Sequence, residues 1–239
     1  MTAPATSQTR RSLTTSRANA RSSSSTRSRL GAISLAISGI LFVLYPAIRP
    51  FSSEKGLDGA AAFGSSHWIV AHMLAMVGFT LLALGLVGWH SSLQHSDVES
   101  SAFRAFVVTL AGIGLTLPFY GGEAYGLHAI GQEALSRGDG SLIDMAAVVR
   151  GGAGLMMFLT GLLVLAVGAI MVARVIWTSR EGMKWIGVPF AVAFVLYIPQ
   201  FFGSQPLRVA HGLLVALGCA LIAISMWRQG ESEQSGIQH

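Results

Sequence analysis

Charged residues are scarce in this chain of 239 residues. Asp, Glu, Lys and Arg together make up 11 % of it, whereas hydrophobic residues make up 52 %. Ordinary soluble domains carry about 25 % charged residues. The composition therefore excludes an ordinary soluble domain and predicts a membrane protein, and the length fits a single domain.

Cysteine is almost absent, because Cys219 is the only one in the chain. One cysteine excludes an internal disulfide, a CxxC redox pair and a thiolate-rich zinc or iron–sulfur site. The sequence also contains no GxSxG, Walker or GxGxxG pattern, so the familiar hydrolase and nucleotide-binding motifs are missing. Any chemistry must therefore depend on a few other polar side chains.

Long stretches without charge locate the membrane spans. A charge at the bilayer centre costs at least ~2.5–3.5 kcal/mol, and about 20 helical residues cross the ~30 Å hydrocarbon core. We predict an all-α protein, a polytopic bundle of six transmembrane helices within residues 30–228. The predicted helices are residues 30–48, 68–89, 105–128, 151–173, 185–202 and 206–227.

Polar tails flank this transmembrane domain at residues 1–29 and 229–239. The N-terminal tail is rich in Ser, Thr and Arg and has no acidic residue, so it cannot bury enough surface to fold and is predicted to be disordered. The same composition is typical of an organellar transit peptide, which leaves an organellar inner membrane as an alternative location.

The distribution of Lys and Arg between alternate loops predicts the orientation. Eleven of these residues lie on the side of the two termini and five on the other side. By the positive-inside rule both termini are cytoplasmic, in a multi-pass protein of the cell membrane. The lipid bilayer is therefore an expected partner. Nucleic acid is not, because the excess positive charge comes from the N-terminal tail rather than from a folded basic surface.

Short sequence matches predict an internal repeat of helical hairpins. FVLYP ends the first predicted span at residues 42–46, and FVLYIP ends the fifth at residues 194–199. The next span begins with Val-Ala-His in both cases, at residues 70–72 and 209–211. Spans three and four would be a more diverged copy, giving three hairpins. Repeats of this kind commonly place a binding site on their shared axis.

Glu123 is the only acidic residue of the eleven that falls within a predicted span. An ionisable group there must face a cavity or a partner, so it is a functional candidate by default. Tyr120 lies three residues earlier on the same helix face. We predict Glu123 and Tyr120 as catalytic residues, with a structural ion pair of Glu123 with Arg150, Arg208 or a histidine as the alternative.

His72 and His211 occupy equivalent positions in the suspected repeat, each about one and a half turns from the outer end of its span. Two neutral imidazoles from two helices can ligate haem iron or a divalent metal. Trp68 and Arg208 lie one turn before these histidines, where Arg208 can meet a propionate or another anion. His128 is a further candidate ligand. The first hypothesis is therefore a membrane redox protein with haem b or a divalent metal as cofactor.

Other functions fit the same residues. A membrane-embedded enzyme acting on a lipid or an isoprenoid, for example a cyclase, would use Glu123 as general acid. A small proton-coupled transporter would use Glu123 as its titrating group, and a non-catalytic membrane subunit would use none of these residues chemically. Hydrogen-bonded structural histidines are the alternative to metal ligation. The sequence leaves these hypotheses open.

Overall fold

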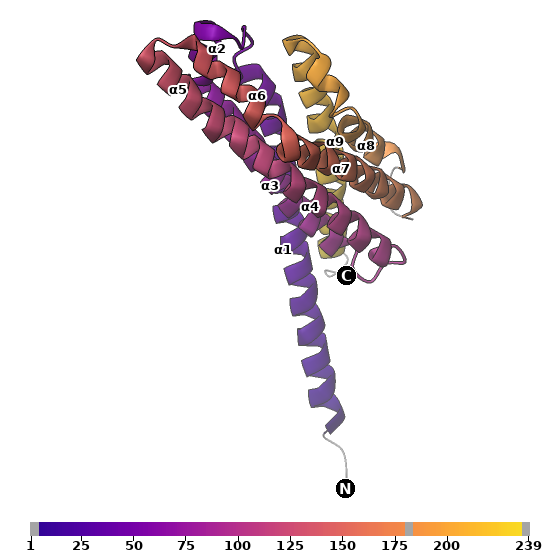
Figure 1. Cartoon of the computed structure of the whole chain (residues 1–239). Helices are drawn as coiled ribbons and strands as arrows, with labels where there is room; N and C mark the ends of the chain where they lie inside the picture. Colours follow the sequence, from indigo (N-terminus) through magenta and orange to yellow (C-terminus); the bar gives the residue numbers. More distant parts are fainter. Residues whose placement is uncertain (1–4, 180–183, 236–239) are drawn as a thin grey trace.

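All regular structure in the computed structural model is helical over the residues whose backbone it describes, 5–179 and 184–235 (Figure 1). Side chains are described for residues 26–179, 184–229 and 231. The elements are α1 (Ala5–Ile48), α2 (Gly56–Phe63), α3 (Ser66–Ser92), α4 (Glu99–Gly121), the π-helical turn η1 (Gly122–Gly126), α5 (Leu127–Arg137), the 3₁₀ turn η2 (Gly140–Met145), α6 (Ala146–Val149), α7 (Gly152–Thr178), the 3₁₀ turn η3 (Lys184–Gly187), α8 (Val188–Val195), the 3₁₀ turn η4 (Pro199–Phe202) and α9 (Gln205–Ser235). The predicted all-α class is confirmed.

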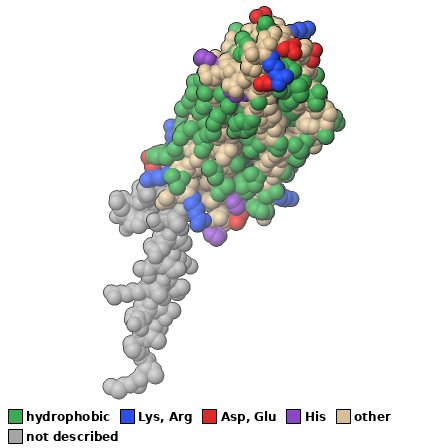
Figure 2. Space-filling view, turned by 60° about the vertical axis from the view of Figure 1, so that its left-hand side comes forward, with side chains coloured by type: hydrophobic (Ala, Val, Ile, Leu, Met, Phe, Trp, Pro, Cys, Tyr) green, Lys and Arg blue, Asp and Glu red, His purple; other side chains and the backbone are tan. Residues whose placement is uncertain are grey.

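Five helical stretches among the described residues are long and apolar enough to cross a membrane. They are Thr26–Ile48, Ser66–Ser92, Glu99–Arg137, Gly152–Thr178 and Gln205–Gln229. Each of them overlaps one predicted span. Figure 2 shows hydrophobic side chains on the flank of the bundle, between charged groups that gather at its two ends. Such a wide apolar surface is unusual for a soluble protein and suits contact with lipid.

The fifth predicted span, residues 185–202, is not one long helix. It is divided into η3, α8 and η4. Pro199 has no N–H to bond the carbonyl of Val195 and its ring crowds that carbonyl, so α8 ends at Val195. A kink or helix end at Pro199 follows from its missing N–H, whereas the division of residues 185–202 into three elements was not predicted.

This broken stretch nevertheless follows α7 and α9 along the bundle. Gly187 lies against Ala173 of α7, and Phe190 lies against Gly218 of α9. Nearer the cap, the hydroxyl of Tyr197 lies 2.8 Å from the hydroxyl of Tyr120 in α4. The stretch therefore packs along α7 and α9 in interrupted form.

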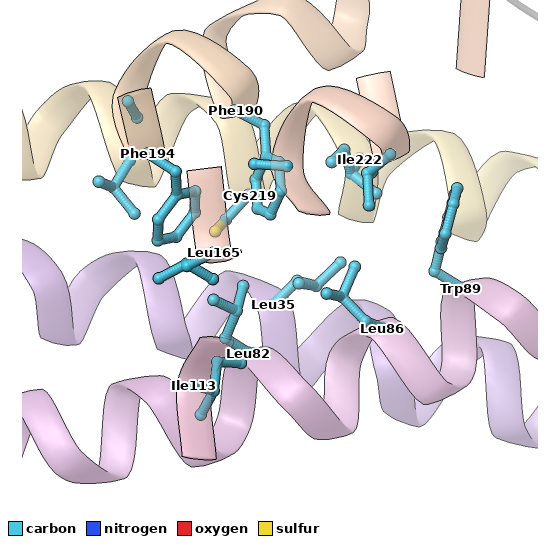
Figure 3. Packing of buried hydrophobic residues seen from close by; sticks show 14 of the residues in the cluster. Leu35, Leu82, Leu86, Trp89, Ile113, Leu165, Phe190, Phe194, Cys219 and Ile222 are labelled. Carbon is cyan, nitrogen blue, oxygen red and sulfur yellow. The ribbon is translucent and has the colours of Figure 1, made fainter. Parts of the chain in front are cut away.

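The helices form a closed ring around an apolar interior. α1 packs between α3 and α9, α4 packs between α3 and α7, and α8 packs between α7 and α9. Small residues allow close backbone approach, as where Gly31 meets Gly88 and where Gly112 meets Leu165. Figure 3 shows Leu165 and Cys219 among the large apolar side chains that fill the interior. The threefold repeat of hairpins stays a prediction.

A small group of helices, which we name the cap (residues 56–63 and 127–149), lies at one end of the ring (upper end in Figure 1). The continuous helical stretch Glu99–Arg137 has 39 residues. Its length of about 58 Å, at 1.5 Å per residue, exceeds a ~30 Å hydrocarbon core. Its last turns therefore extend beyond the ring and carry the cap, which has its own apolar cluster around Phe63 and Leu127.

The first and last candidate spans meet at the end of the ring opposite the cap. The guanidinium of Arg29 lies 5.5 Å from the ring of Trp227, and the hydroxyl of Ser28 donates to the carbonyl of Met226. The backbone of α1 begins at Ala5, while the side chains before Thr26 lie outside the described residues. Disorder of the N-terminal tail and the cytoplasmic location of the termini stay predictions.

Candidate functional site

A cavity with a volume of about 510 Å³ lies at the end of the ring that carries the cap. Most of its lining side chains fall into two groups, and Tyr45, Phe51, Ser52, Tyr120 and Phe202 complete the lining. The apolar wall consists of Phe119, Leu155, Phe158, Leu159, Ile198 and Phe201. The charged wall consists of Arg49, Glu54, Glu123, Arg150 and Arg208. The cavity therefore has the lining that an amphipathic molecule requires.

Glu123 and Arg150 form a bidentate ion pair in the charged wall. Arg150 Nε donates to Glu123 Oε1 at 2.5 Å, and Arg150 Nη2 donates to Oε2 at 2.9 Å. Glu123 is buried within the π-helical turn η1, a distortion that is frequent at functional sites. Because a guanidinium only donates, both Glu123 oxygens act as hydrogen-bond acceptors in this pair. The geometry thus matches the ion-pair alternative rather than a general acid.

The ion pair extends through Glu54 to Arg49. Arg150 Nη1 donates to Glu54 Oε2 at 2.5 Å, and Arg49 Nη2 donates to Oε1 at 2.6 Å. Burial acts to raise the pKa of Glu54, but the hydrogen bond and charge of Arg150, with those of Arg49, outweigh burial and lower it. The four side chains form one alternating network of charges across the span ends.

Neither Glu54 nor Arg49 was among the predicted site residues. Both flank the end of the first span, where charges are expected to lie in water. Their separation of five residues in a short loop was the only signal in the sequence that they pair. The fold brings this loop against Arg150, which lies 96 residues after Glu54.

Trp68 and His72 of α3 lie against Glu123. Trp68 is fully buried and its indole Nε1 donates to the carbonyl of Glu123 at 2.7 Å. The guanidinium of Arg49 lies 4.5 Å from the Trp68 ring. His72 Nδ1 donates to the carbonyl of Trp68 at 2.8 Å, and its Nε2 lies 3.6 Å from Glu123 Oε2. These contacts fix η1 against α3.

Two buried tyrosines, Tyr120 and Tyr197, and the partly buried Tyr45 extend the polar cluster across the ring. The hydroxyls of Tyr120 and Tyr197 are 2.8 Å apart, and the ring of Tyr45 lies 5.7 Å from that of Tyr120. Tyr45 meets His72 edge-on at 5.4 Å, and Tyr197 meets His211 edge-on at 5.2 Å. Tyr45 and Tyr120 face the cavity, whereas Tyr197 lies behind them.

The predicted metal ligands are not gathered into one site. His211 Nε2 donates to the carbonyl of Ala193 at 2.8 Å, and His128 Nδ1 donates to the carbonyl of Phe63 in the cap at 2.9 Å. No group of three or more His, Cys, Asp or Glu side chains is placed to hold a metal ion in the part of the chain that the structure describes. Each histidine instead bonds to a backbone carbonyl, as the structural alternative expected.

Arg208 faces the same cavity from the start of α9, across from Glu123. Its Nε donates to the carbonyl of Gly203 at 3.1 Å and its Nη2 to that of Phe201 at 2.5 Å. Its guanidinium lies 4.9 Å from the Phe51 ring. Unlike Arg49 and Arg150, Arg208 has no carboxylate partner among the described residues.

The structure therefore joins Trp68, His72, Tyr120 and Glu123 in one cluster and places Arg208 on the same cavity, but it leaves His211 and His128 apart from that cluster. Comparison with protein-family models, with curated proteins and with solved structures finds no match to this chain. The function must be argued from the geometry of the site.

Proposed function

We propose that this chain is a multi-pass membrane protein, with six crossings and both termini in the cytoplasm, that binds one lipid or isoprenoid in the cavity at its outer end. The observation that carries the proposal is the division of a single cavity into an apolar wall and a charged wall. A ligand with a hydrocarbon tail and a polar headgroup matches both walls at once.

The apolar wall supports the hydrocarbon part of this ligand. Phe119 and Phe158 stack with their ring centroids 4.1 Å apart, and the neighbouring leucines continue the surface along the first turns of α7. Each CH₂ group that leaves water against such a surface contributes about 0.8 kcal/mol. The volume also lies within the range of about 300–1,000 Å³ that is usual for small-molecule sites.

The position of the charged wall supports the polar part. Arg49 directly follows α1, Arg150 shortly precedes α7, and Arg208 lies in the first turn of α9. These ends of candidate spans mark the level at which lipid headgroups lie in a bilayer. A lipid whose headgroup sits at this level directs its tail toward the apolar wall.

Glu123 and Tyr120 are binding residues in this proposal. Glu123 holds Arg150 in place through its two carboxylate oxygens, and Tyr120 lines the cavity between the two walls. The haem or metal hypothesis has less support, because no group of three or more His, Cys, Asp or Glu side chains among the described residues is placed to hold a metal ion. The transporter hypothesis has less support, because Glu123 is tied to an arginine.

Filling the cavity tests the proposal. Leu159→Trp places a bulky ring in the apolar wall, whereas Leu163→Trp places the same ring one turn further along α7, at a side chain that is 60 % exposed. Lipid is extracted from each protein after purification in mild detergent and quantified by mass spectrometry. We expect about one bound lipid per chain in the wild type and in Leu163→Trp, and a loss of most of it in Leu159→Trp.

Two results would refute the proposal. One is a wild-type protein that folds normally and retains no lipid. The other is a Leu159→Trp protein that retains as much lipid as Leu163→Trp. Helical content and elution volume of the three proteins show whether each variant is folded.

A further inference from the structure

We infer, resting on the proposed function, that the bound lipid carries an anionic phosphate headgroup and that Arg208 is the residue that selects it. The inference concerns the headgroup of the ligand, whereas the proposed function concerns only the presence of an amphipathic ligand. It follows from the charge balance of the cavity and from the free donors of one arginine.

The charged wall has one positive charge in excess. Three arginines and two glutamates line the cavity. Glu54 pairs with both Arg49 and Arg150, and Glu123 pairs with Arg150. All four carboxylate oxygens are thus engaged within this network. The charge of Arg208 is left for a ligand to neutralise.

Arg208 is held in a fixed orientation with donors to spare. The carbonyls of Phe201 and Gly203 accept from two of its three nitrogens, and the Phe51 ring lies 4.9 Å from its guanidinium carbon. A guanidinium has five N–H donors. The N–H groups on Nη1 have no hydrogen-bond partner among the described residues, and Arg208 lines the cavity. The side chain is thus preorganised to donate to a group in the cavity.

A phosphate is the group that suits these donors at this depth. The planar guanidinium pairs with phosphate oxygens through two parallel hydrogen bonds, which adds geometric specificity to the charge attraction. A zwitterionic headgroup has no net charge and leaves the excess of the charged wall uncompensated. Free inorganic phosphate shares the headgroup chemistry but lacks the tail for the apolar wall.

The test compares headgroups that carry the same tails. Delipidated protein in detergent is titrated with dihexanoyl phosphatidylglycerol, with dihexanoyl phosphatidylcholine and with inorganic phosphate, and binding is followed by calorimetry. We expect the wild type to bind the anionic lipid at least tenfold more tightly than the zwitterionic one. In Arg208→Gln this ratio falls to threefold or less, while the affinity for the zwitterionic lipid stays within about twofold.

Two further variants separate the role of Arg208 from general effects of charge and folding. Arg137→Gln removes the same charge from an exposed residue of the cap that pairs with Glu133, and it should keep the wild-type ratio. Arg208→Lys keeps the charge without the planar pair of donors, and its ratio should lie between those of the wild type and Arg208→Gln.

The outcomes distinguish failure of the inference from failure of the proposed function. If the folded wild type binds neither lipid, the proposed function fails and the inference fails with it. If both lipids bind equally, or if Arg208→Gln keeps the full preference, only the inference is overturned. If inorganic phosphate binds as tightly as the anionic lipid and displaces it, the site recognises phosphate, but the claim that this phosphate belongs to a lipid is overturned.

Discussion

At the scale of single residues, Arg150 connects the two glutamates of the site through ion pairs. It donates to Glu123 through Nε and Nη2, and to Glu54 through Nη1. Burial acts to lower its pKa, but the hydrogen bonds and charges of Glu123 and Glu54 outweigh burial and raise it. Arg150 therefore stays charged, and both carboxylates accept hydrogen bonds from it.

Arg150→Gln should lower the free energy of unfolding by about 3–5 kcal/mol, because it leaves the buried carboxylate of Glu123 without its partner. Adding Glu123→Gln removes the unpaired charge, so the double variant should regain part of that loss. Denaturation in detergent, followed by circular dichroism, measures both effects. A loss below about 0.5 kcal/mol in the single variant, the range of ordinary surface substitutions, would contradict the role given to this pair.

Glu54 predicts a pH dependence of stability. Its pKa in the folded protein is lowered from the ordinary value of 4.5, so its contribution is complete above that value and is lost as the pH falls through the folded pKa. Glu54→Gln should therefore be less stable than the wild type by a constant amount between pH 7 and pH 5. The difference should shrink as the pH falls below about 4.5. Unfolding curves measured across this range would speak against the network if the difference grew on acidification.

Part of the site was predictable from the sequence. Glu123 was identified because a charge within an apolar span must find a partner, and Arg150 was among the partners considered. Glu54 and Arg49 were missed, because residues at the end of a span are expected to face water and only the tertiary path of the loop brings them to Arg150. The equivalent placement of His72 and His211 suggested ligation, but each ring instead satisfies a backbone carbonyl.

At the scale of elements, apolar runs bounded by charge predicted six spans, and five of them are long helices in the structure. The missing N–H of Pro199 accounts for a break in residues 185–202, but the division of this stretch into three short elements was not predicted, because hydropathy records only how apolar a stretch is. The cap was missed for another reason. Its helices are short, from four residues in α6 to eleven in α5, and so they carry too few turns for a clear periodic pattern. Their stability depends on packing against Phe63 and Trp68.

The contact between α4 and α7 depends on small residues. A Cβ atom added at Gly112 would lie 2.5 Å from the backbone nitrogen of Leu165, whereas one added at Gly114 would meet nothing within 4 Å. Gly112→Ala should therefore force the helices apart and lower stability by about 1–3 kcal/mol. Gly114→Ala should be neutral or stabilise the protein by up to about 1 kcal/mol.

Thermal unfolding of both variants in the same detergent checks this prediction. Glycine-to-alanine changes at both positions raise helix propensity equally, so the difference between the variants isolates the packing effect. Equal melting temperatures would show that the two helices do not approach as closely as the structure has them.

At the scale of the whole molecule, the ring of helices has the cap at one end, and the start of the first candidate span lies beside the end of the last one at the other. The positive-inside rule predicts that the cap faces outward. In a Cys219→Ala background, Ser141→Cys in the cap should react with a membrane-impermeant maleimide in intact cells. Gln94→Cys, between α3 and α4, should react only after the cells are permeabilised. The opposite labelling pattern would place the cap in the cytoplasm.

The central claim is that the cavity between the apolar wall and the charged wall holds a lipid. The most direct measurement is a density map of the protein in lipid nanodiscs, bound to an antibody fragment that makes it large enough for imaging. The proposal predicts an elongated density that begins beside Arg208 and ends against Phe158 and Leu159. A well-resolved cavity that contains only separate water peaks, or side chains that close it entirely, would contradict the claim.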